Sequence, residues 1–122
     1  MTINNYLSRC SALLGDTVGE ETLLSWLAEI ENTVIREIKE THFAGESYDS
    51  PCAENGGREA ALTVVDPYSS LYIDYAVMKN DLFLRDIQRY MNSASVFHNS
   101  YSAYADYVNR TNMPLGEKKI EV

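Results

Sequence analysis

The sequence predicts an all-α protein, a small helical bundle of about four helices, and three observations support this fold class. Apolar residues recur at the 3.6-residue period of a helix through most of the chain. Alternation typical of a strand is limited to two short stretches. The 122 residues, 45% of them hydrophobic, suit one compact domain, which we assign to residues 1–112 ahead of a flexible tail over residues 113–122.

The first two helices are expected over residues 2–14 and 20–42. Thr2 can cap the first helix, and Gly15 and Gly19 bracket the turn that follows. The second segment has the most sustained helical pattern, formed by Leu23, Leu24, Trp26, Leu27, Ile30, Val34, Ile35 and Ile38. We interpret its charged side as a solvent-exposed face, which carries Glu29, Glu31, Arg36, Glu37, Lys39 and Glu40.

A long loop is expected over residues 43–66, because the helical pattern stops there. The segment contains Gly45, Pro51 and the Gly56-Gly57 pair. Apolar alternation returns only over residues 62–65, where one short strand could form. Loops longer than about 12–15 residues tend to bind partners or to be disordered. We therefore expect an arm that becomes ordered on contact with a partner.

Two further helices are expected after the loop. Asp66-Pro67 predicts the start of the third, with the aspartate as cap and the proline in the first turn. Its apolar surface is broad enough to predict contact on two sides. The NSAS sequence at residues 92–95 can cap a fourth helix that ends near Asn109. One unbroken helix over residues 67–109 is the alternative.

Nine tyrosines are an unusual feature of so short a chain, and three of them lie within residues 101–107. A single core cannot absorb all three rings, because helical spacing directs them to more than one face. We expect Tyr101 and Tyr104 in the core and Tyr107 against a neighbouring molecule. The full predicted core consists of Trp26, Ile30, Ile38, Leu71, Tyr75, Met78, Phe97 and Tyr101.

The net charge of −8 belongs entirely to the first half of the chain. Residues 1–66 hold 12 acids and 4 bases, whereas residues 67–122 hold 6 of each. Because affinity for DNA depends on Lys and Arg that release counterions from phosphates, this balance argues against sequence-specific nucleic-acid binding. No apolar run approaches the ~18–20 residues of a membrane span, and the first ten residues do not resemble a secretory signal, so we expect a soluble cytoplasmic protein.

No arrangement of reactive residues indicates catalysis or a cofactor. The two histidines, His42 and His98, lack the Glu-x-x-His spacing of a metal-binding bundle, and Cys10 and Cys52 form no CxxC pair. No glycine motif for phosphate is present. The sequence therefore predicts a protein that is not an enzyme and binds no cofactor or metal, and an enzyme with an unfamiliar helical site is the more distant alternative.

Two segments resemble a known class of phage protein. The runs VDPYSSLYIDYAVMKND and RYMNSASVFHNSYSAYADYVNRTNMP resemble small proteins encoded among the capsid genes of prophages in Gram-positive bacteria. The predicted helix order is similar to that of the head-to-tail connector, or head-completion, proteins of long-tailed phages. The resemblance covers residues 66–114 and, more loosely, residues 20–42.

This resemblance implies a structural subunit that assembles as a ring between the portal and the tail, around an acidic channel for DNA. Its partners would be the portal protein, tail-completion proteins and further copies of itself. It would reside in the host bacterial cytoplasm during assembly and then in the virion. The expected interface residues are Tyr48, Val64, Tyr72, Tyr107, Pro114 and Ile120. The alternative that the acidic composition leaves open is a helical inhibitor, a DNA mimic or antitoxin-like module that occupies a basic groove.

Overall fold

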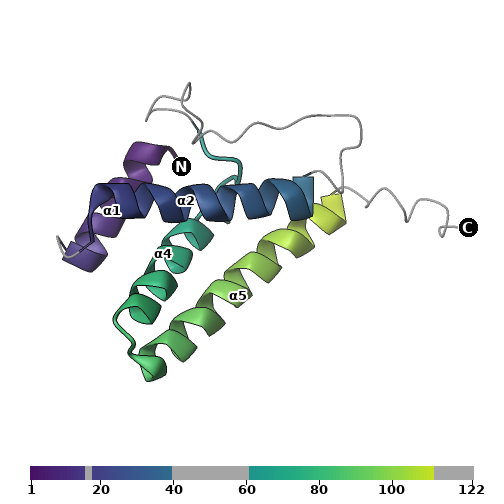
Figure 1. The fold of residues 1–122 in the computed structure, drawn as a ribbon. Helices are drawn as coiled ribbons and strands as arrows, with labels where there is room; N and C mark the ends of the chain where they lie inside the picture. Colours follow the sequence, from purple (N-terminus) through teal and green to yellow (C-terminus); the bar gives the residue numbers. More distant parts are fainter. Residues whose placement is uncertain (16–17, 40–60, 112–122) are drawn as a thin grey trace, which may run out of the picture.

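The structure is a computed structural model that describes residues 1–15, 18–39 and 61–111. The predicted all-α class is confirmed, because four α-helices pack together. They are α1 (Ile3–Leu14), α2 (Glu20–Val34), α4 (Ser70–Phe83) and α5 (Ile87–Thr111), and a π-helical turn, η2 (Ile35–Lys39), extends α2. Figure 1 shows α4 and α5 meeting at a sharp corner, with α2 across the open end of the V that they form. No helix in these three ranges is long and apolar enough to cross a membrane.

The first helix forms as predicted, between a threonine cap and a glycine. The Thr2 hydroxyl accepts a hydrogen bond from the Asn5 N–H at 3.2 Å, which satisfies one of the free donors at the helix start. Gly15 ends the helix with φ of 69°, a left-handed conformation that glycine adopts without steric cost. Tyr6 fastens α1 to α2, because its buried hydroxyl donates to the Leu23 carbonyl oxygen at 2.8 Å.

The second predicted helix is present, but its last turn is wider than a regular α-helix. α2 ends at Val34, and Ile35–Lys39 continue as a π-helical turn. Ile35 and Ile38 remain buried in this turn, as their spacing predicted. Residues 40–42 lie outside the described ranges.

The predicted start of the third helix is wrong by about one turn. α4 begins at Ser70 and residues 66–69 form turns, with a cis peptide bond between Asp66 and Pro67. Asp66 accepts a hydrogen bond from the Ser69 hydroxyl, not from a backbone N–H as a helix cap would. This bond, helped by the chain's terminal amino group, holds the pKa of the Asp66 carboxyl below its ordinary value.

The prediction of two separate helices is confirmed and the alternative of one unbroken helix is wrong, but the break was predicted too late, because the chain turns at residues 84–86 and not at residues 92–95. Arg85 adopts a left-handed conformation with φ of 58°, and the Asp86 Oδ1 accepts from the Arg89 N–H at 3.2 Å. Aspartate in this position is a strong N-cap. Residues 92–95 lie inside α5, where the Ser93 hydroxyl bonds back to the Arg89 carbonyl oxygen at 2.9 Å and does not cap a new helix.

Residues 62–65 do not form the strand that their alternation allowed. Within the described ranges the only strand-type pairing is an isolated bridge between Thr2 and Ala61, beside which the Leu62 N–H donates to the Met1 carbonyl oxygen at 2.9 Å. Leu62 and Val64 are nevertheless buried, with 6% and 0% of their surface exposed. The segment therefore packs as irregular chain over the helices.

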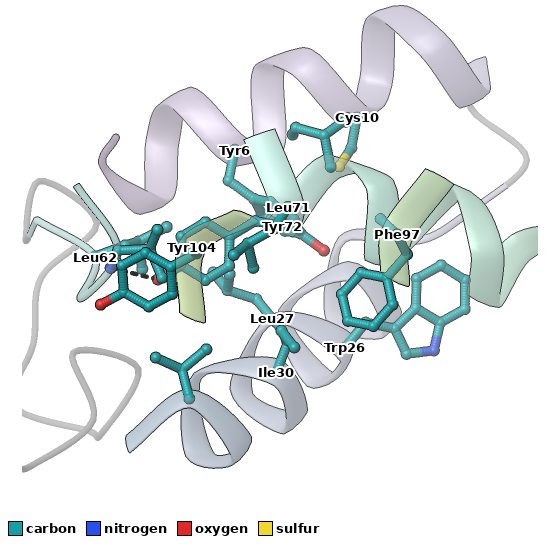
Figure 2. Packing of buried hydrophobic residues seen from close by; sticks show 14 of the residues in the cluster. Tyr6, Cys10, Trp26, Leu27, Ile30, Leu62, Leu71, Tyr72, Phe97 and Tyr104 are labelled. Carbon is teal, nitrogen blue, oxygen red and sulfur yellow. Dashed lines mark hydrogen bonds between the residues drawn. The ribbon is translucent and has the colours of Figure 1, made fainter. Parts of the chain in front are cut away.

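The core agrees largely with the sequence prediction. Of the eight predicted members, five are buried, namely Trp26, Ile30, Ile38, Leu71 and Phe97. The other three, Tyr75, Met78 and Tyr101, are half-buried and pack against the cluster. Figure 2 shows the Phe97 ring beside the Trp26 indole. Cys10 is also buried, and burial raises the pKa of its thiol to about 11.

A buried carboxylate lies at the centre of the core, where the sequence predicted a solvent-exposed one. Glu31 has 0% of its surface exposed. Its Oε2 accepts from the Thr63 N–H at 3.1 Å and from the Thr63 hydroxyl at 3.0 Å, and its Oε1 accepts from the Tyr72 hydroxyl. The same Tyr72 oxygen accepts from the Val64 N–H at 2.8 Å. The network joins α2, α4 and residues 63–64, and it corrects the prediction of a charged outer face at this position.

Tyrosine–glutamate pairs recur along α2 and η2. Besides Tyr72 with Glu31, Tyr75 donates to the Glu29 Oε1 at 2.8 Å and Tyr101 donates to the Glu37 Oε1 at 2.7 Å. Burial, followed by the neighbouring carboxylate, raises the pKa of all three tyrosines above the ordinary value of 10.0. Three of the tyrosines therefore hold α4 and α5 against the acidic helix.

Replacing Tyr72 with Phe should lower the free energy of unfolding by about 2–3 kcal/mol, because a buried charge loses a donor and the buried Val64 N–H loses its acceptor. Tyr75→Phe is the matched control, since it removes the same kind of bond at a half-exposed site and should cost about 0.5 kcal/mol. Urea unfolding of both variants measures the difference. Equal losses of unfolding free energy would show that the buried hydrogen bonds of Tyr72 stabilise the fold no more than the exposed bond of Tyr75.

The protein should lose stability in alkali, and Tyr104 should contribute to the loss. Burial, with the charge of Glu31 as a smaller cause, raises the pKa of Tyr104 from 10.0 to about 12. A phenol with a raised pKa in the folded state stabilises that state fully below its unfolded pKa, and this contribution disappears as the pH rises towards the folded pKa. Urea midpoints should therefore be constant near about pH 8 and fall above about pH 10. Tyr104→Phe should make this fall shallower, and an unchanged slope would contradict the assignment.

Candidate assembly surface

Five of the eight large hydrophobic side chains that are exposed in the described residues belong to the corner between α4 and α5. Five large side chains there have about half or more of their surface in solvent: Leu82 (47%), Phe83 (76%), Leu84 (57%), Ile87 (63%) and Met91 (59%). We call these five residues the α4–α5 tip. At roughly 180 Å² for each fully exposed side chain of this size, they present roughly 500 Å² to solvent. The largest apolar patch on a typical monomer is about 300–600 Å², and such patches are often functional.

The local sequence explains why these residues are exposed. α4 ends at Phe83, and the left-handed Arg85 reverses the chain before Asp86 caps α5. Ile87 and Met91 then stand one turn apart on the same side of α5. The apolar residues before and after the reversal are exposed, and Phe83 lines a small hollow of about 80 Å³ with Val18, Gly19, Thr22 and Trp26.

Polar contacts beneath the tip fix its shape. Asp81 has only 2% of its surface exposed, and it accepts a hydrogen bond from the Ser93 hydroxyl across the hairpin. The Arg89 Nε lies 3.8 Å from the Asp81 Oδ1, with the Arg89 side chain largely in solvent. Because a buried carboxylate without donors is costly, these contacts hold α4 and α5 in one register. The tip is therefore a preformed surface.

A second feature is a surface depression between α1 and α4. It has a volume of about 300 Å³ and is lined by Arg9, Ala12, Leu13, Ser70, Ile73 and Asp74. We call it the α1–α4 depression. Leu13 has 64% of its surface exposed, and Ile73 only 7%. The Asp74 Oδ2 accepts from the Ser100 hydroxyl at 2.6 Å, which fixes the carboxylate at the edge of the depression.

The predicted interface residues fare differently. Val64 and Tyr72 each have 0% of their surface exposed, so their prediction as surface contacts is wrong: Tyr72 hydrogen-bonds inside the Glu31 network, and Val64 packs in the core beside it. Tyr107 is half-buried, and its ring stacks on Tyr68 with centroids 4.9 Å apart. Tyr48, Pro114 and Ile120 lie outside the described residues, as do most of the predicted loop and the whole tail over residues 113–122.

The sequence prediction missed the tip because it let the third helix continue to the NSAS sequence at residues 92–95. The signal was present in the run from Asp81 to Met91, in which Asp86 stands three residues before Arg89, within an apolar stretch. A cap at this point ends the preceding helix, so Leu82 and Phe83 fall at a helix end and not in its middle.

The described residues contain no group of three or more His, Cys, Asp or Glu side chains that could hold a metal ion. His98 is exposed on α5, with its ring 5.8 Å from the Phe97 ring. His42 and Cys52 lie outside the described ranges. Comparison of the chain with protein-family models, with curated proteins and with solved structures gave no match.

Because the tip lies outside the core, Phe83→Ser should change the free energy of unfolding by only about 0.5 kcal/mol, a quarter of the value of a buried phenylalanine. Phe97→Ala, at a ring with 8% exposure, should cost about 3–5 kcal/mol. Urea or thermal unfolding compares the two variants. A loss at position 83 as large as that at position 97 would mean that the tip serves stability and not contact.

Proposed function

We propose that this protein is a structural component of a tailed-phage particle, a head-to-tail connector subunit that assembles as a ring between the portal and the tail. The observation that carries the proposal is the α4–α5 tip, an apolar surface that the folded chain leaves in solvent and holds in a fixed shape. Exposed apolar patches of this size are often functional. Burial against another protein would turn that surface into binding free energy.

Two sequence features direct the proposal towards a connector. The first is the resemblance of residues 66–114 to small proteins of prophage capsid regions. The second is the acidic balance, because a channel through which DNA slides should not carry the Lys and Arg that bind phosphates. We infer that the partners are the portal protein, tail-completion proteins and further copies of the chain, first in the host cytoplasm and then in the virion.

The contacts of α2 and η2 count against the alternative of an acidic inhibitor that imitates DNA. Such a protein must present carboxylates to solvent at a spacing like that of phosphates. Glu31 is buried, and Glu29 and Glu37 each receive a tyrosine hydroxyl from another helix. These three acids are therefore positioned by the fold of the chain itself and not by the geometry of a nucleic acid.

The purified protein should bind the purified portal protein encoded in the same phage genome and sediment with it as one larger species. A portal from an unrelated phage is the matched control, because a specific interface depends on complementary shape and charge. Sedimentation velocity with and without each portal measures the binding.

Failure to bind the matched portal, combined with displacement of DNA from a basic DNA-binding protein, would replace the connector proposal with the acidic inhibitor. Failure to bind the matched portal without such displacement would also overturn the connector proposal.

A further inference from the structure

We propose that residues 61–64 form a strap that opens as one unit while the four helices stay folded, and that the Glu31 carboxylate is the latch that holds the strap closed. The inference concerns a movement within one chain, so it does not depend on the proposed function. The strap comes before the turns over residues 66–69 that lead into α4, and the chain ahead of it, residues 40–60, lies outside the described ranges.

Two linked side chains hold the backbone of the strap against α2 and α4. The Glu31 Oε2 accepts from the Thr63 N–H at 3.1 Å and from the Thr63 hydroxyl at 3.0 Å. The Val64 N–H donates at 2.8 Å to the Tyr72 hydroxyl oxygen, and the Tyr72 hydroxyl itself donates to Glu31. Because these groups form one hydrogen-bonded network, a change at one bond affects the others. The strap is therefore held as a unit and not residue by residue.

Beyond this network the strap has few attachments to the described residues. The Leu62 N–H donates to the Met1 carbonyl oxygen at 2.9 Å, beside the isolated bridge between Thr2 and Ala61. Among the buried residues of the described core, only Leu62 and Val64 lie outside the helices. Segments of irregular chain with few buried apolar side chains open at the lowest free energy. The strap is therefore the part of this core that we expect to open first.

The helices keep contacts of their own when the strap is open. The Tyr72 hydroxyl still joins α4 to Glu31, and the hydrogen bond from Tyr75 to Glu29 still joins α4 to α2. Water replaces the Thr63 donors at the uncovered carboxylate of Glu31, so opening leaves no buried charge without donors. Opening the strap therefore costs less free energy than separating the helices.

Opening changes the surface that the protein presents. In the closed form Leu62 is almost fully buried, and Val64 and Glu31 are completely buried. In the open form the two apolar side chains leave the core and the carboxylate meets solvent. A molecule that binds the open form would raise its population, because a ligand shifts a conformational equilibrium towards the state that it binds more tightly. The strap is thus a switch between two surfaces.

Hydrogen exchange of individual amides, followed by NMR over a series of low urea concentrations, tests the opening. After correction for intrinsic rates, the amides of Leu62, Thr63 and Val64 should exchange at similar rates, at least about tenfold faster than the slowest amides of α2 and α5. Their exchange should also depend less on urea than that of the slowest amides, because urea dependence grows with the surface that an opening exposes.

Thr63→Val tests the latch, because valine has nearly the shape of threonine but cannot donate its side-chain hydrogen bond to Glu31. All three strap amides should exchange at least about fivefold faster in this variant, including that of Leu62, whose own acceptor is unchanged. Thr33→Val is the matched control, since the Thr33 hydroxyl donates within α2 to the Glu29 carbonyl oxygen at 2.9 Å. Exchange of the strap amides in this control should stay within about twofold of the wild-type rates.

Four results would overturn the inference. Strap amides with the rates and the urea dependence of the slowest helical amides would show that the strap opens only when the whole chain unfolds. Strap amides that exchange at their intrinsic rates in the wild-type chain would show that nothing holds the strap closed. In Thr63→Val, faster exchange of the residue 63 amide alone would exclude opening as a unit, and unchanged exchange of all three amides would exclude Glu31 as the latch.

Discussion

The buried carboxylate of Glu31 is the constraint on which the arrangement of the helices depends. A charge taken out of water costs several kcal/mol unless donors surround it, and here the donors come from other parts of the chain: the Thr63 backbone and hydroxyl, and the Tyr72 hydroxyl. Tyr72 in turn fixes the Val64 backbone. Apolar packing alone would tolerate small shifts between α2, α4 and residues 61–65. These hydrogen bonds form in only one relative position of the three segments. Within the described residues, no buried side-chain polar atom is left without a partner.

The same chemistry links some of the acids in the first half of the chain with tyrosines in the second half. Three glutamates on α2 and η2 receive three tyrosine hydroxyls from α4 and α5. Tyrosine suits this role because its ring packs against apolar neighbours while its hydroxyl reaches a carboxylate at the edge of the core. The rings of Tyr68, Tyr104 and Tyr107 pack against one another. A neighbouring molecule is therefore not required to explain most of the aromatic surface.

The sequence predicted the helices well because amphipathic spacing reports burial directly, and Trp26, Ile30 and Leu71 are in the core for that reason. The prediction failed where a charged side chain is buried instead of exposed. Glu31 lies among charges that look solvent-exposed, and spacing alone cannot distinguish a buried carboxylate from its neighbours when its donors are more than 30 residues away. The corner before α5 was missed for a different reason, since Ser93 and Asp86 are both acceptable caps and only the three-dimensional structure shows which one is used. Tyr72 and Val64 were wrongly predicted as surface residues for the same reason, because the hydrogen bonds around Glu31 bury them.

The polar contacts at the α4–α5 corner have a different effect from those in the rest of the protein. The Glu31 network brings apolar surface together, whereas Asp81, Ser93 and the Asp86 cap hold apolar surface apart from the core. Without the reversal at residues 84–86, Leu82, Phe83 and Ile87 would continue along one helix, on stripes of which a core could cover part. The reversal instead places them near one corner, where about half or more of each side chain stays exposed. Stability of the single chain gives no reason for such an arrangement, because exposed apolar surface favours aggregation. The exposed corner is therefore the surface at which the assembly proposal places the contact with another molecule.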